Sequence, residues 1–251
     1  MNIKTVSFNI RCCDDVDGHA ISERAPRLNE ILFKIKPDLI GFQECQLPWE
    51  PLIEDAYLKD YEMYLVHRAE KNPESTPILW RRDRFSCLEK GHFWLSDTPD
   101  VESRGWDELF NCYRICLWAL LQDKESGEKF VFMNTHYGFG DKGQCDSGDL
   151  IAARAKAIGD YPIVLTGDFN MKPTDAGYGQ ITSYFTDSNA VTSRDFRATF
   201  HGYAPEKHLD EHIDYCFVND KVMPVSYTML DETFDGKYPS DHYGLLVELM
   251  I

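Results

Sequence analysis

The sequence predicts an α/β fold in which mixed β-sheets are covered by helices. Two observations point to this class. In the first part of the chain, strand-like and helix-like segments alternate, which is typical of parallel strands joined by crossover helices. Further along, strand-like segments are separated by short turn-rich bridges, which is typical of antiparallel hairpins. A chain with both kinds of connection is expected to form mixed sheets.

The first β-α-β unit is the most clearly defined. Residues 3–10 alternate and are rich in β-forming side chains, which predicts a strand. Apolar residues then recur at the spacing of one helix face: Leu28, Ile31, Leu32 and Ile35. Pro26 suits the first turn of this helix and Pro37 ends it, after which residues 38–42 are interpreted as a buried strand.

The remaining elements follow in order along the chain. Helices are predicted over residues 48–58 and 150–158. Further strands are predicted at residues 62–66, 78–80, 85–88, 115–121, 130–134, 162–166, 213–218, 222–229 and 244–249. The turn-rich segment 123–128 and the basic segment 81–84 are each interpreted as the tip of a hairpin. Because no repeat, low-complexity segment or linker divides the chain, residues 1–251 are expected to form a single domain.

Composition limits the function classes. The chain has 26 Lys and Arg against 42 Asp and Glu, a net charge of −16, which disfavours a protein that coats long nucleic acids or anionic membranes. Its 43% hydrophobic residues are enough for a folded core and exclude a disordered chain. The sequence lacks a signal peptide and an apolar run of about 18 residues, so a cytoplasmic protein without membrane insertion is expected. Nothing in the sequence indicates an obligate protein partner.

Several predicted strands end in polar residues that bind cations or handle phosphate. These residues are Asn9, Glu44, His136, Asp168, Asn170, Asp214, Asp241 and His242. Each alone is more often a turn or structural residue, but together they indicate a site for a hard cation with acid and base groups. Magnesium prefers oxygen ligands, which Glu44, Asp241 and the amide of Asn9 offer. A zinc site would need more imidazole or thiolate, and the eight cysteines lack paired C-x-x-C spacing.

Six motifs carry a resemblance to a known family. They are residues 7–9, 39–44, 134–136, 167–170, 213–215 and 238–242. In order and spacing they resemble the motifs of the endonuclease/exonuclease/phosphatase superfamily over nearly the whole chain. This resemblance implies the DNase I-like fold, a four-layered α/β sandwich of two mixed sheets packed face to face with helices outside. Residues 91–100 and 104–107 resemble a bacterial stand-alone branch that is similar to deadenylase-type nucleases.

The resemblance also implies a metal and its ligands. Glu44 would be the main Mg²⁺ ligand, and Asn9 and Asp241 would complete or support the metal shell. Mn²⁺ is a possible substitute for Mg²⁺.

Catalytic roles are implied for five further residues. Asp168 would orient and deprotonate the attacking water, and Asn170 would hold the phosphate or that water. His242 would stabilise the charge of the transition state, while Asp214 orients its imidazole and favours the charged form. His136 would contact the phosphate from another side.

Other features concern the substrate. Residues 137–145 depart from the family pattern and are interpreted as a loop rich in Gly and Asp beside the site. Arg114 either contacts phosphate or forms a salt bridge, and Trp106 either stacks on a base or sugar or packs in the core. Arg114 and Lys172 are candidates for a local basic rim.

The implied reaction is hydrolysis of a phosphodiester by in-line attack of an activated water. Because the chain offers few basic clusters to contact many phosphates, we expect a nuclease that acts, like an exonuclease, on short or terminal nucleic acid. One alternative is a small-molecule or phospholipid-headgroup phosphatase or phosphodiesterase on the same fold. Another is a catalytically idle binding protein, against which the complete set of acid and base residues argues.

Overall fold

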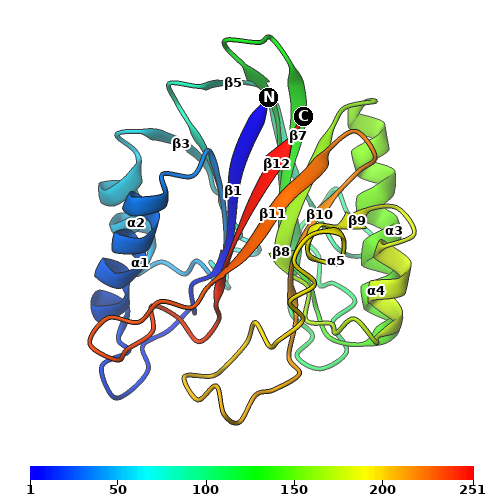
Figure 1. Cartoon of the computed structure of the whole chain (residues 1–251). Helices are drawn as coiled ribbons and strands as arrows, with labels where there is room; N and C mark the ends of the chain where they lie inside the picture. The colour runs from blue at the N-terminus through cyan, green and yellow to red at the C-terminus, as the bar shows by residue number, and fades with distance from the viewer.

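Two six-stranded mixed sheets lie face to face in the computed structural model, which describes residues 1–251 (Figure 1). The first sheet contains, in spatial order, β11 (Met223–Leu230), β12 (Gly244–Met250), β1 (Asn2–Asn9), β2 (Leu39–Gln43), β4 (Ile78–Arg81) and β3 (Tyr61–Tyr64). The second contains β5 (Phe85–Trp94), β6 (Ile115–Asp123), β7 (Lys129–His136), β8 (Ile163–Asp168), β10 (Asp214–Val218) and β9 (Thr186–Asp187).

Helices cover the outer face of each sheet. The helices α1 (Ile21–Ile35) and α2 (Glu50–Tyr57) lie outside the first sheet, and α3 (Asp141–Ile158) and α4 (Ala176–Ile181) lie outside the second (Figure 1). A short helix, α5 (Ser188–Val191), packs beside β10 and β11. These four layers confirm the predicted DNase I-like sandwich. None of the helices combines the length and the apolar composition needed to span a bilayer.

Two parallel strand pairs determine where the polar strand ends lie. β1 and β2 are parallel and are joined by α1, and β7 and β8 are parallel and are joined by α3. All other neighbouring strands are antiparallel. Because parallel strands end at the same edge of a sheet, the loops after β1, β2, β7 and β8 gather at one end of the molecule. The chain termini lie side by side at the other end, where Asn2 pairs with Met250 (Figure 1).

Apolar side chains form a core between each pair of layers. A cluster of 19 buried residues fills the space between the two sheets. A cluster of 17 joins the first sheet to α1 and α2, and another of 17 joins the second sheet to α3. Strands between two such layers are buried on both faces, which is why β2 and β8 are buried at every position.

The structure corrects two helix starts. α1 begins at Ile21, so Pro26 lies one turn inside the helix and not in its first turn; the Ala20 N–H donates to the Glu23 side chain and defines the start. α3 begins at Asp141, so residues 141–145, expected in a loop, are helical. Its first turns pack through small or polar buried residues such as Gly143 and Gln144, which give no apolar periodicity.

The basic segment 81–84 is not a hairpin tip, because β4 and β5 belong to different sheets. Arg84 pairs with Asp38 at 2.8 Å and with Asp123 at 3.0 Å, and so links the start of β2 to the end of β6. Arg84 therefore stabilises the point where the chain crosses from the first sheet to the second. The elements α4, α5 and β9 were not predicted. They have six, four and two residues, which is too short to show a helical or strand periodicity of apolar residues.

The two sheets approach each other closely at Gly41 in β2. A Cβ at this position would lie 2.5 Å from Thr166 Oγ1 and 2.6 Å from Asn134 Oδ1, both on the second sheet. The space holds a buried polar network: Gln43 Nε2 and Thr166 Oγ1 both donate to Asn134 Oδ1, at 2.8 and 3.0 Å. Asn134 Nδ2 returns a hydrogen bond to the carbonyl oxygen of Phe42 at 2.7 Å. The missing side chain of Gly41 therefore makes room for the bonds that join the sheets.

We predict that Gly41→Ala lowers the free energy of unfolding by about 3 kcal/mol, because overpacking adds to the loss of the Asn134 hydrogen bonds. Urea denaturation measures the change. Gly179→Ala in α4 is the matched control, since a Cβ there meets nothing within 4 Å. Equal urea midpoints for the two variants would contradict the role of Gly41.

Candidate active site

A cavity of about 620 Å³ opens at the end of the sandwich where β1, β2, β7 and β8 terminate. Seven of the site residues predicted from the sequence line it: Glu44, Arg114, His136, Asp168, Asn170, Asp241 and His242. Asn9 and Asp214 lie directly behind, hydrogen-bonded to lining residues. The structure thus brings nine of the ten predicted residues together.

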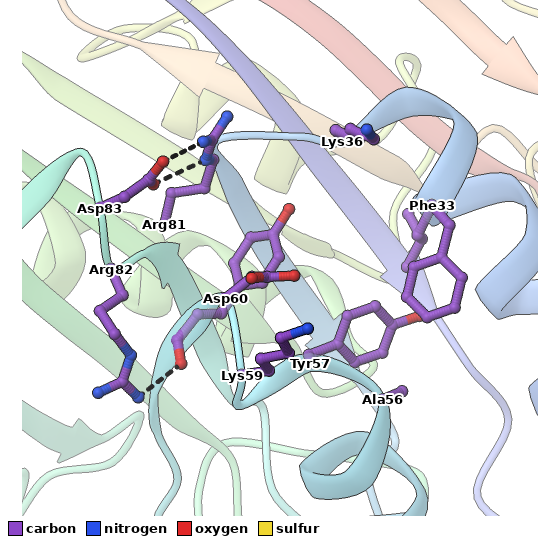
Figure 2. Close-up of a pocket in the computed structure, with 11 residues that line it drawn as sticks. Phe33, Lys36, Ala56, Tyr57, Lys59, Asp60, Arg81, Arg82 and Asp83 are labelled. Carbon is purple, nitrogen blue, oxygen red and sulfur yellow. Dashed lines mark hydrogen bonds and ion pairs between the residues drawn. The ribbon is translucent and has the colours of Figure 1, made fainter.

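A second hollow of about 570 Å³ lies between the end of α1 and the start of β3 (Figure 2). Its two arginines are bonded to neighbouring groups: Arg81 bonds to Asp83 at 2.9 Å, and Arg82 donates to the carbonyl oxygen of Tyr61 at 3.1 Å (Figure 2). The hollow and the polar cluster lie at opposite ends of β2. Arg81 pairs with Tyr61 beyond the amino end of β2, whereas Glu44 follows the carboxyl end of β2. This hollow is therefore separate from the polar cluster and has none of its buried acid and base groups.

Left-handed backbone turns aim three side chains into the cavity. Arg11, Glu44 and Asn170 follow β1, β2 and β8 and have φ values of 60°, 61° and 49°. Non-glycine residues rarely adopt this conformation, and it tends to persist where the surrounding structure enforces it. Each turn folds the chain away from its strand while keeping the side chain at the sheet edge.

Glu44 is held by two donors. Its Oε2 accepts the backbone N–H of Cys12 at 2.8 Å, and its Oε1 accepts Asn9 Nδ2 at 3.2 Å. Burial acts to raise the pKa of Glu44, but the charge of His242 and these hydrogen bonds outweigh it and lower the pKa. Glu44 is therefore an anion in the cavity wall.

Asn9 joins two carboxylates. Its Nδ2 also donates to Asp168 Oδ2 at 2.9 Å, while its Oδ1 accepts the backbone N–H of Arg11 at 3.0 Å. In this orientation the amide oxygen predicted as a metal ligand accepts a backbone N–H with one of its two lone pairs. Asn9 supports Glu44 and Asp168 as a donor.

Asp168 lies at the centre of the polar cluster. Its Oδ1 accepts the backbone N–H of Asn170 at 3.0 Å, and its Oδ2 lies 3.5 Å from His136 Nε2 and 3.9 Å from His242 Nε2. Burial and the neighbouring carboxylate of Asp214 raise the pKa of Asp168 to about 7, against the opposing effect of His242. A carboxyl with this pKa exchanges protons near neutral pH.

His242 forms a hydrogen bond with Asp214 on the side of its ring that faces away from the cavity. Its Nδ1 lies 2.9 Å from Asp214 Oδ2, and the backbone N–H of Asp214 donates to Thr199 Oγ1 at 3.0 Å. Burial alone would lower the pKa of His242, but Asp214, Asp168 and Asp241 raise it to about 10. His242 is therefore an imidazolium ion at neutral pH.

The pKa of His136 is shifted in the opposite direction to that of His242. Burial and the positive charges of Arg114, Arg68 and His242 lower its pKa well below the usual range, so the ring is neutral. Asn170 Nδ2 donates to His136 Nε2 at 3.0 Å, which places the ring proton on Nδ1. That buried nitrogen has no hydrogen-bond partner and lies 3.9 Å from Glu74 Oε1. Sequence reasoning missed Glu74, which lies between β3 and β4 and follows no predicted strand.

The donor chemistry of the cavity suits a divalent cation bound by oxygen. Glu44 and Asp241 both line it, and burial together with the charge of Glu44 raises the pKa of Asp241. A cation between two such carboxylates relieves their repulsion. A second group, Asp168, Asp214 and His242, has ligand atoms within 4.8 Å of one another. It suits a metal less well, because protonated His242 has no lone pair to donate.

The two residues predicted to contact substrate have different positions. Arg114 lines the cavity, but its Nη2 is 3.2 Å from Asp107 Oδ2, so the salt bridge is formed. Trp106 does not line the cavity; its indole N–H donates to Asp97 at 3.1 Å and its main chain packs against Gly143. For Trp106 the structure therefore favours the packing alternative.

Several lining residues gave no sequence signal. They are Arg11, Phe110, Phe139, Asp175, Phe200 and Glu211. All lie in loops, where isolated aromatic or charged residues have no periodicity to distinguish them. Lys172, predicted as a possible basic rim, does line the cavity.

Known proteins resemble the chain over its whole length. The profile of the Endonuclease/Exonuclease/phosphatase family matches residues 6–242, which confirms the resemblance seen in the motifs. The crystal structure of a family protein from Bacteroides thetaiotaomicron is 31% identical, with a TM-score of 0.90 over 99% of this chain and 97% of that one. A mannosyl-6-phosphatase from the same organism is 30% identical, with a TM-score of 0.88 over 99% and 100% of the two chains.

A plant protein is more distant. Carbon catabolite repressor protein 4 homolog 3 of Arabidopsis thaliana is 27% identical over 166 residues, which cover 61% of this chain and 34% of that protein. The chain thus spans about a third of the length of this curated relative.

The His242–Asp214 pair yields a pH prediction. His242 has a raised pKa, so its stabilising effect is complete below its ordinary value of 6.5 and is lost as pH rises through about 10. Asp214→Asn should lower the pKa of His242 by more than one unit, because one negative charge and a charge-assisted bond disappear. NMR titration of the imidazole in metal-free protein measures this change. An unchanged titration midpoint would show that Asp214 does not control the charge of His242.

Proposed function

The chain belongs to the endonuclease/exonuclease/phosphatase family and is a phosphoester hydrolase, and we propose that its substrate is a small phosphate ester cleaved with the aid of Mg²⁺. The substrate carries one phosphoryl group, and the whole chain acts as one catalytic domain. We retain from the sequence the predictions of a cytoplasmic location and of no obligate protein partner.

The pairing of every arginine and lysine in the cavity wall carries this proposal. Arg11 bonds to Asp15 at 3.0 Å, Arg114 to Asp107 at 3.2 Å, and Lys172 to Asp210 at 2.8 Å. A nucleic acid strand would need further cations to follow its second and third phosphates. Together with the net charge of −16, these neutralised cations favour a substrate that ends at the cavity.

Glu44 and Asp241 would hold the metal, with Asn9 supporting Glu44. Bound there, Mg²⁺ supplies charge neutralisation on the phosphoryl oxygens. Arg11 Nε lies 3.6 Å from Asp241 Oδ2 and limits the movement of that carboxylate.

Asp168 acts as the base that orients and deprotonates the attacking water. Its pKa of about 7 lets it take a proton near neutral pH, and Asn9 keeps one of its oxygens in place. Imidazolium His242 donates to a phosphoryl oxygen from one side. Neutral His136 lies on another side of the phosphate, where its Nε2 accepts from Asn170 Nδ2 and positions that amide. The base thus lies at the end of β8 in the second sheet, and the charged donor lies just before β12 in the first.

A nuclease that acts at the end of a strand is the second candidate. The cavity contains one exposed aromatic ring, Phe110, which offers a stacking face to a terminal base. This is the function expected from the motifs, and it requires only one phosphodiester to enter the site.

We predict that Glu44→Gln and Asp168→Asn each lower kcat/KM for p-nitrophenyl phosphate by about 10³-fold, through different steps. Glu44→Gln should weaken Mg²⁺ binding in calorimetry, whereas Asp168→Asn should retain it. Removal of divalent ions with EDTA should abolish turnover by the wild type, and added Mg²⁺ should restore it.

Glu232→Gln is the control, since Glu232 pairs only with Lys34 on the helical face. Turnover that persists in EDTA would contradict the metal role. Faster cleavage of single-stranded RNA than of small esters would select the nuclease instead.

A further inference from the structure

Two phenylalanines form an aromatic wall on the cavity. Phe110 and Phe139 both line it, with ring centroids 5.4 Å apart and planes at 75°. Phe110 is 60% exposed. An exposed aromatic ring beside a catalytic cavity offers an apolar face to whatever enters.

The wall is firmly supported. Asp107 Oδ1 accepts the backbone N–H groups of Leu109 and Phe110 at 3.0 and 2.8 Å, while its Oδ2 binds Arg114. The backbone N–H of Glu108 donates to the carbonyl oxygen of Phe139 at 2.9 Å. These bonds join the loop that carries Phe110 to the loop that carries Phe139, so the pair is organised before any ligand binds.

Two glycines allow the loops to touch. A Cβ on Gly138 would lie 2.7 Å from Asp107 Cβ, and one on Gly140, whose φ is 106°, would lie 2.4 Å from Glu108 Cδ. The Gly-rich segment that departs from the family pattern therefore has a packing role. It brings Phe139 against Phe110.

Another part of the cavity lining is polar. Asp175 and Glu211 also line it, and Asp175 Oδ2 is fixed by the backbone N–H of Lys172 at 2.7 Å. Carboxylates accept hydrogen bonds from hydroxyl groups and repel a second phosphate. A ligand that suits both parts of the lining has an apolar ring face and several hydroxyls.

We propose that Phe110 and Phe139 form the subsite for the leaving group and select phosphate esters of a pyranose sugar. This inference rests on the proposed function and names its substrate class. The electron-rich faces of the rings attract the C–H groups on one face of the sugar, while its hydroxyls reach Asp175 and Glu211. A nucleoside 5′-monophosphate also offers a ring face and ribose hydroxyls, so it is the competing substrate class in the test.

The test compares a cyclic and an open-chain ester of the same hexose skeleton: a methyl hexopyranoside 6-phosphate and the hexitol 6-phosphate. The wild type with Mg²⁺ should prefer the pyranoside by about 10-fold or more in kcat/KM, the range expected for a lost apolar contact. Phe110→Ala and Phe139→Leu should reduce this preference to within about 3-fold, mainly by slowing turnover of the pyranoside. Thermal unfolding shows whether each variant is folded, and Phe139→Leu keeps most of the buried volume.

Phe33→Ala is the matched control, because Phe33 is also an exposed phenylalanine but lies in the other hollow (Figure 2). Equal efficiencies on the two esters in the wild type, or equal losses on both in the variants, would overturn the subsite. Preference for a nucleoside 5′-monophosphate that disappears in Phe110→Ala would overturn the sugar class. Absence of phosphate release from all three esters would overturn the proposed function itself.

Discussion

The close approach of the two sheets at Gly41 is the constraint on which the site depends. Half of the polar cluster belongs to the first sheet, after β1 and β2 and before β12, and half to the second, at the ends of β7 and β8 and the start of β10. Asn134 bonds across the gap, so its network fixes the distance between the two halves. Asn9 Nδ2 then bridges Glu44 of the first sheet and Asp168 of the second. A shift of one sheet over the other would break the bridge before it disturbed the apolar core.

Within the cluster, one carboxyl lies between two histidines of opposite charge state. His242 is kept protonated by Asp214, whereas His136 is kept neutral by burial beside arginines. Asp168, 3.5 Å from one and 3.9 Å from the other, has a pKa raised by burial to about 7. Identical side chains thus have different charge states because their charged neighbours differ, and those neighbours lie both in the cavity wall and behind it.

The acidic residues of the chain also determine the charge of the cavity wall. Acidic residues neutralise each arginine and lysine of the wall, through pairs such as Arg114–Asp107 and Lys172–Asp210. The wall therefore attracts a phosphoryl group mainly at the metal position and at His242, and offers little to a chain of phosphates. Charge balance and the aromatic pair favour the same kind of ligand, which is small, singly phosphorylated and ring-shaped.

By itself the sequence determined the class of fold, the family and the class of reaction, because polar residues directly after buried strands occur in recognisable motifs. Asn9, Glu44, His136, Asp168, Asn170, Asp214, Asp241 and His242 all reach one place, as those motifs predict. Only the tertiary structure decided that the neighbours Asp241 and His242 both line the cavity. It also showed that Asn9 donates through its amide nitrogen to Glu44 and Asp168, and that Glu74 lies behind His136. It also decided that Trp106 packs away from the site and that α3 begins nine residues before its apolar stripe. These features depend on contacts between segments far apart in the chain, and local periodicity carries no information about such contacts.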